Sequence, residues 1–308
     1  MAYARTFRRR TYRKRAPARR PRKSSYRKKP RTRRPTRSAM RPTKRYLLNV
    51  TSTKKRDTMR QWTNTNSSGA PTSVVGAPAY VNGNTGGVFL WCATARDITD
   101  STGEPNTVTN SMQRTATTCF MRGLSERIDI QSSSAVPWKW RRICFALKDP
   151  TLFASGTGAT INYPGYLDSS HGYLRGWINA LVNNDNPALS NLQSVLFQGA
   201  QNVDWSDAIM AKVDTRRVDL KFDKTRIIQS GNDTGVFKKY PHWHPMNKNL
   251  VYDDDERGES TVSSNFSVTD KRGMGDYVIM DIFNAHASAS AADVLRIQSE
   301  STLYWHEK

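Results

Sequence analysis

The residues with the clearest capacity for chemistry are the arginines and lysines near the N-terminus. Residues 1–56 hold 24 of the 48 Lys and Arg residues and no Asp or Glu, because the first carboxylate in the chain is Asp57. Arginine presents a planar fork of donors that matches phosphate, and many cations acting together bind a polyanion by releasing its counterions. Four aromatic residues are interleaved with these charges: Tyr3, Phe7, Tyr12 and Tyr26. Rings between cations suit single-stranded nucleic acid, whose exposed bases can stack on them.

Residues 1–45 are therefore predicted to be a nucleic-acid-binding arm. The arm lacks the apolar residues needed to offset the entropy of ordering, so we expect it to be disordered when alone. The same cations can serve as a nuclear localisation signal. The residues predicted to bind nucleic acid are Arg5, Arg8, Arg9, Arg10, Arg13, Lys14, Arg15, Arg19, Arg20, Arg22, Lys23, Arg27, Lys28, Lys29, Arg31, Arg33, Arg34 and Arg37.

A second pattern could support catalysis. His242-Trp243-His244 has the His-hydrophobe-His form of the metal-holding motif in rolling-circle endonucleases, which also use a Tyr followed by a Lys, as in Tyr304 and Lys308. In such enzymes the Tyr lies on a helix, whereas 302–308 is predicted to be a strand. The two histidines, placed between prolines, are predicted to lie in a loop. We therefore expect no catalytic residue, no metal site and no cofactor, and keep the endonuclease as an alternative.

A dense acidic cluster is formed by Asp253, Asp254, Asp255 and Glu256. A solvated turn is one interpretation. Another is a contact between subunits, in which the cluster pairs with a basic patch on a neighbour. A cation site is a third, although the spacing differs from that of a calcium-binding loop.

The remaining residues, 46–308, carry almost balanced charge and read mainly as strands separated by long polar loops, including 69–87 and 97–118. Two helices are predicted, one from the spacing of Leu174, Trp177, Ile178 and Leu181, and one from Leu189, Leu192 and Leu196 after Asn186-Pro187. A β-bulge is expected at Arg141-Arg142. The predicted strands are 46–53, 88–94, 120–131, 138–147, 218–223, 236–240, 277–283, 294–298 and 302–305.

This pattern predicts an all-β fold, a single eight-stranded antiparallel jelly roll of two packed sheets with one or two short helices. Strands do not alternate regularly with helices, which argues against a parallel sheet. No apolar run approaches the ~18 residues that span a bilayer, so no membrane partner is expected. The three cysteines are widely spaced and odd in number, so we predict buried, reduced thiols.

Four C-terminal blocks resemble the capsid proteins of genomoviruses, the gemycircularvirus group, which have small circular single-stranded DNA genomes and are related to geminiviruses. The N-terminal MAYARTFRRRTYRKR is also typical of that family. The blocks are VDLKFDKTRII at 218–228, KKYPHWHPMNKNLVYDDDE at 238–256, DYVIMDIF at 276–283 and LRIQSESTLYWHEK at 295–308.

The resemblance implies a jelly-roll subunit that assembles into an icosahedral T=1 shell of sixty copies and packages single-stranded DNA through the arm. It also implies a host nuclear import receptor as a partner, assembly in the host nucleus and a final location in the virion. No catalytic residue of the family exists to carry over. The alternative from another class is a non-viral nucleic-acid-binding protein with a basic tail, which a large near-neutral body with eight tryptophans argues against.

Overall fold

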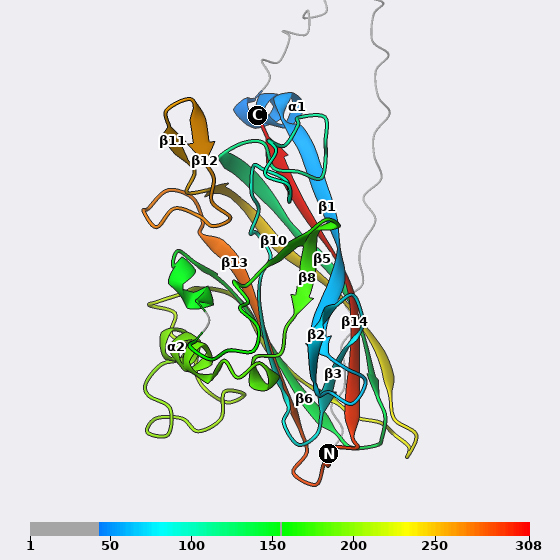
Figure 1. The fold of residues 1–308 in the computed structure, drawn as a ribbon. Coiled ribbons are helices and arrows are strands. Elements are labelled where there is room, and N and C mark those ends of the chain that lie inside the picture. The colour runs from blue at the N-terminus through cyan, green and yellow to red at the C-terminus, as the bar shows by residue number, and fades with distance from the viewer. Residues whose placement is uncertain (1–42, 155) are drawn as a thin grey trace, which may run out of the picture. The chain divides into compact units, whose positions relative to one another are not determined.

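The computed structural model describes residues 43–154 and 156–308 (Figure 1). The chain divides into two units, Met1–Lys44 and Arg45–Lys308, and the described strands belong to the second unit. Strands dominate it, which confirms the all-β prediction, although the described residues form fourteen strands rather than eight.

The larger sheet has the strand order β10-β5-β14-β1-β8-β7, and β2 and β3 extend it by pairing with β1 and β14. All of its pairings are antiparallel except that of β1 with β8, so the sheet is mixed. Its strands are β1 (Thr53–Thr65), β2 (Pro71–Val75), β3 (Ala79–Asn82), β5 (Thr118–Ser132), β7 (Leu167–Ser169), β8 (Gly172–Trp177), β10 (Phe237–Val251) and β14 (Val294–Glu307).

The smaller sheet has the order β4-β13-β6-β9, and a separate hairpin joins β11 to β12. The described residues also include two α-helices and two short 3-10 helices. The strands are β4 (Gly87–Cys92), β6 (Trp138–Leu147), β9 (Asp219–Ile228), β11 (Asp255–Arg257), β12 (Ser260–Val262) and β13 (Asp276–Ala285). The helices are α1 (Lys44–Thr51), η1 (Pro150–Phe153), η2 (Ala180–Val182) and α2 (Asn186–Leu196).

The eight principal strands pair in a nested way. β1 pairs with β14, β4 with β13, β5 with β10, and β6 with β9, each antiparallel. The chain therefore follows one long hairpin that is folded over into two layers, β10-β5-β14-β1 and β4-β13-β6-β9. Strands far apart in the sequence meet in the centre of each layer.

The core has three apolar clusters, two between the sheets and one on the outer side of the smaller sheet. In the outer cluster, α2 and nearby loops cover β13 and β6 on the side away from the larger sheet (Figure 1). Eight consecutive residues of β13 are consequently buried, from Asp276 to Phe283. Because both faces of this strand are covered, it needs no alternation of polar and apolar residues.

Several predicted elements are correct. The strands expected at 88–94, 120–131, 138–147 and 277–283 correspond to β4, β5, β6 and β13, and the helix after Asn186-Pro187 is α2. The strand at 218–223 is the start of β9, and the two strands at 294–298 and 302–305 are one strand, β14. The three cysteines are free and buried, as predicted.

Other predictions are wrong. The segment 46–53 is largely the helix α1, because β14 pairs no further than Thr53 and the preceding residues have no strand to join. The loop at 69–87 contains β2 and β3. The helix expected at 174–181 is β8 followed by η2, since β8 joins the larger sheet through β1 and β7. The register shift in β6 falls between Cys144 and Phe145 rather than at Arg141-Arg142.

Among the helices that the structure describes, none combines the length and apolar character that crossing a bilayer requires.

Candidate nucleic-acid interface and buried charge network

The cations predicted to bind nucleic acid, Arg5 to Arg37, lie outside the described residues. The body itself contains a different set of charges that sequence reasoning missed. Two arginines and two carboxylates meet between the sheets, and each of the four side chains is at most 1% exposed. We call Glu126, Arg142, Arg175 and Asp281 the buried charge network.

The network joins strands of both sheets. Arg142 of β6 donates to Asp281 of β13 through two hydrogen bonds of 2.8 Å, and to Glu126 of β5 at 2.5 Å. Arg175 of β8 contacts the same two carboxylates, at 3.0 Å to Glu126 and 3.1 Å to Asp281. Each carboxylate is thus shared by two guanidinium groups, and the four charges balance.

Surrounding groups complete this arrangement. Trp140 donates its indole N–H to Asp281 at 2.8 Å, and Ser301 donates to Glu126 at 3.0 Å. The Arg175 guanidinium carbon lies 4.4 Å from the ring centre of Trp91 and 4.1 Å from that of Trp177. Such contacts favour a desolvated cation.

The charges hold one another in the ionised state. Burial alone would raise the pKa of Glu126, but Arg142 and Arg175 hold it well below its usual range. The carboxylates likewise raise the pKa of Arg142 against the effect of burial. Because every member is enclosed and already paired, we interpret the network as a structural element.

His242 and His244 lie in strand β10, so the prediction that they lie in a loop is wrong. Pro241 and Pro245 are tolerated because β10 is the edge strand of its sheet. The two imidazole rings stack with centres 5.6 Å apart, on the inner side of the sheet, and His244 Nε2 lies 3.8 Å from Glu126. Burial, reinforced by the charge of Arg142, lowers the pKa of each histidine to about 4.

Tyr304 does not join these histidines. Successive side chains in a strand point to opposite faces, so Trp243 lies on the outer side of the sheet, and its ring centre is 5.9 Å from that of Tyr304. The sheet therefore separates Tyr304 from His242 and His244. Within residues 43–154 and 156–308, no group of three or more His, Cys, Asp or Glu is arranged to hold a metal ion.

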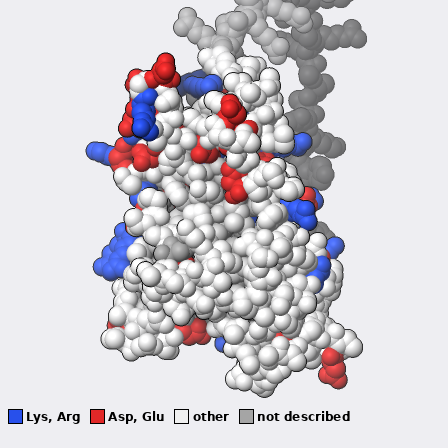
Figure 2. Space-filling view, viewed as in Figure 1, with Lys and Arg blue, Asp and Glu red and all other residues white. Residues whose placement is uncertain are grey.

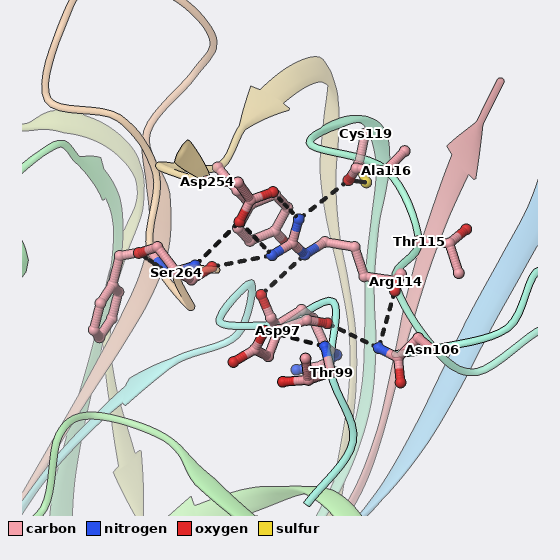
Figure 3. A network of polar contacts seen from close by, with 12 residues as sticks. Asp97, Thr99, Asn106, Arg114, Thr115, Ala116, Cys119, Asp254 and Ser264 are labelled. Atoms are coloured by element: carbon pink, nitrogen blue, oxygen red, sulfur yellow. Dashed lines mark hydrogen bonds and ion pairs between the residues drawn. The ribbon is translucent and has the colours of Figure 1, made fainter. Parts of the chain in front are cut away.

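The acidic cluster is divided by the fold. Asp253, Asp255 and Glu256 are exposed, whereas the side chain of Asp254 is 1% exposed and pairs with Arg114 at 2.6 Å. Burial opposes this ionisation, but hydrogen bonds from Arg114 lower the pKa of Asp254 below its usual value. Arg114 also donates to the carbonyl of Ser264 (Figure 3).

Arg114 thus anchors the polar loop 97–118. Its Nε donates to the Arg96 carbonyl and its Nη1 to the Ala116 carbonyl, while Asn106 bridges Asp97 and the Arg114 carbonyl (Figure 3). A loop with few apolar residues is fixed in this way by one buried cation. The position of Asp254 is consistent with a role inside the fold, which leaves its three neighbours free for solvent or for a partner.

Comparison with known proteins gives no matching family model and no matching curated protein.

The first prediction concerns the charge network. Arg142→Met should lower the free energy of unfolding by about 3–5 kcal/mol, because it leaves Glu126 and Asp281 buried with half of their counter-charge. Denaturant unfolding measures the change. Arg127→Met is the matched control, since Arg127 follows Glu126 on β5 with its side chain 81% exposed, and it should change stability by less than about 0.5 kcal/mol. Equal effects of the two variants would contradict the structural role.

The second prediction concerns pH. The folded-state pKa of His244, about 4, lies below the unfolded value of 6.5, so the unfolded chain takes up this proton first. His244 therefore costs stability as the pH falls from about 6.5 towards 4, by up to about 1.4 kcal/mol per pH unit. Burial raises the pKa of Asp276 to about 6, which has the opposite sign and adds stability as the pH falls through 6.

His244→Gln should flatten the acid-side loss of stability between pH 6.5 and 5, as measured by denaturant unfolding at several pH values. His286→Gln, at an exposed position, is the control and should leave the profile unchanged. An unaltered pH profile in the His244 variant would show that folding does not change the pKa of this histidine.

Proposed function

We propose that this chain is a viral capsid protein, similar to those of genomoviruses, that packages circular single-stranded DNA in a T=1 shell of sixty copies. The observation that carries the proposal is the nested pairing of the eight principal strands in a body that follows residues 1–45, which hold 21 cations and no carboxylate. Neither feature alone is specific to a shell protein.

The nested pairing supports a jelly roll. If the principal strands are numbered one to eight along the chain, the layers have the orders 6-3-8-1 and 2-7-4-5. That is the order produced when a long hairpin of four nested pairs is rolled into two sheets, as in the jelly rolls of viral shells. The other six strands are additions to these eight, and one of them, β8, makes the parallel pairing with β1.

Part of the surface is suited to contacts between copies of the chain. Charged side chains on the face in Figure 2 gather near the β11–β12 end, and the opposite half, around α2, carries few of them. Large apolar residues are exposed in the loops that follow α2, with Val203 82% and Met210 77% exposed. Charge-poor, apolar surface is typical of the centre of a subunit interface.

The basic segment supplies the DNA contact in this proposal, through its Arg and Lys residues between Arg5 and Arg37. Binding by counterion release tolerates any sequence, as packaging of a whole genome requires. We also propose that the segment carries the protein to the host nucleus through an import receptor. Asp253, Asp255 and Glu256, exposed at the β11–β12 hairpin, are proposed as a subunit contact.

The third prediction tests assembly and packaging together. The full chain should form uniform closed particles in negative-stain electron microscopy, with a 260/280 nm absorbance ratio that shows bound nucleic acid. The chain lacking residues 1–45 should lose the nucleic acid. A chain with the same arm residues in shuffled order is the matched control and should package as well as the parent. Soluble monomers from the full chain, with salt-sensitive DNA binding, would favour the non-viral alternative.

The fourth prediction concerns the length of the packaged DNA. Residues 1–56 carry 24 cations in each copy, so sixty copies supply about 1,440 positive charges, and each nucleotide carries one phosphate. If the arms neutralise half to all of the phosphates, the packaged DNA is roughly 1,400–2,900 nucleotides long. Extraction of DNA from purified particles and gel electrophoresis measure it. DNA several times longer would contradict packaging by the arms.

A further inference from the structure

The outer face of the larger sheet carries a group of aromatic side chains, of which Trp243 is exposed and Tyr304, Phe120 and His306 are half-buried. Strands β1, β14 and β5 lie next to one another there, and their register aligns Lys54 with His306 and Phe120, and Arg56 with Tyr304 and Gly123. β10 adds Trp243, which is 52% exposed. We call Trp243, Tyr304, Phe120 and His306 the aromatic platform.

Trp243 is held in place although half of its surface is exposed. Gly123 of β5 has φ +153°, and a Cβ there would lie 2.8 Å from Trp243 Cζ2 and 2.6 Å from the His244 carbonyl oxygen. The indole therefore lies across the backbone of β5 at the one position without a side chain. From there it reaches Tyr304 on the next strand, with ring centres 5.9 Å apart.

A second aromatic pair lies in the adjacent row of the sheet. Phe120 of β5 and His306 of β14 face each other with ring centres 6.1 Å apart. Both pairs stand on the same face, on the three neighbouring strands β10, β5 and β14. Surface rings that are fixed by a rigid sheet lose little entropy when a flat partner stacks on them.

Cations border the platform, and carboxylates are turned away from it. Lys54 and Arg56 lie on β1 and Arg122 on β5, and none of the three forms an ion pair within the described part of the chain. The nearest carboxylates along β1 and β14, Asp57 and Glu307, pair instead with Arg96 and Lys55 inside the body. The platform therefore keeps a net positive charge.

We propose that the aromatic platform binds single-stranded nucleic acid, with unpaired bases stacked on Trp243 and Tyr304 and phosphates held by Arg56, Lys54 and Arg122. This inference rests on the proposed packaging of single-stranded DNA and adds a contact made by the body itself. Base stacking needs exposed base faces, which duplex DNA does not offer. Phosphate neutralisation by three cations is modest, so stacking provides the larger part of the binding.

The salt dependence of binding separates this site from the basic segment. The full chain is titrated with a labelled 20-nucleotide oligo(dT) in increasing salt, and log K is plotted against log salt concentration. Loss of phosphate contacts changes the slope, whereas loss of stacking changes the intercept at 1 M salt. Trp243→Leu combined with Tyr304→Leu should lower the intercept about tenfold or more and leave the slope unchanged.

Two controls complete the experiment. Phe237→Leu removes another exposed aromatic residue of β10, 58% exposed, and should change neither slope nor intercept. Tyr304→Phe keeps the ring and should bind like the parent, whereas in a rolling-circle endonuclease it would abolish nicking. A 20-base-pair duplex should bind the parent and the double variant equally.

Photocrosslinking gives an independent result. An oligonucleotide that contains 5-iodo-deoxyuridine, irradiated with the full chain, should attach to the peptide that carries Trp243 or Tyr304. Crosslinks confined to residues 1–42 would overturn the inference while leaving packaging by the arm intact. Crosslinks at Trp243 without particles would instead contradict the proposed capsid function alone. Loss of particles with unchanged DNA binding in the double variant would mean that the platform is a subunit contact.

Discussion

The rest of the body depends on the buried charge network, because four desolvated charges must meet within hydrogen-bonding distance. Glu126 and Arg175 belong to the larger sheet, and Arg142 and Asp281 to the smaller one. A shift of one residue in any of these strands would move a charge to the opposite face and leave its partners unpaired, at a cost comparable to the stability of a whole domain. The network therefore fixes how the two sheets are aligned.

The sequence predicts the parts of the fold that local pattern determines. β6 and β13 are apolar runs of strand length, and α2 begins at a cap-proline pair, so each was found where expected. The network was missed because its ion pairs join residues up to 139 positions apart, as between Arg142 and Asp281. A signal was nonetheless present. A charged residue inside an apolar strand, such as Asp281 within VIMDIF, is costly to bury unless it is paired, so it indicates a buried partner.

Two errors have the same physical origin, which is burial on both faces. The two consecutive charged residues Arg141-Arg142 interrupt the alternation of β6, which suggests a bulge if one face of the strand is assumed to be exposed to solvent. In the structure Arg142 enters the network, and Arg141 pairs with Asp223 at 2.6 Å on the other side. Likewise, Arg175 points into the core from β8, where helical spacing of the apolar residues was the more visible pattern. The spacing of polar and apolar residues shows which face of an element meets solvent. It cannot show this where both faces are buried.

The nested pairing also determines when during synthesis each strand can meet its partner. β14 is synthesised after every strand that it pairs with, yet it lies at the centre of the larger sheet between β5 and β1. Until it emerges from the ribosome, β1 and β5 present unpaired edges, and the larger sheet cannot close. Topologies dominated by such distant contacts fold slowly and expose aggregation-prone surface meanwhile. Of the four nested pairs, the innermost, β6 with β9, is the first to have both of its strands synthesised, and the outermost, β1 with β14, is the last.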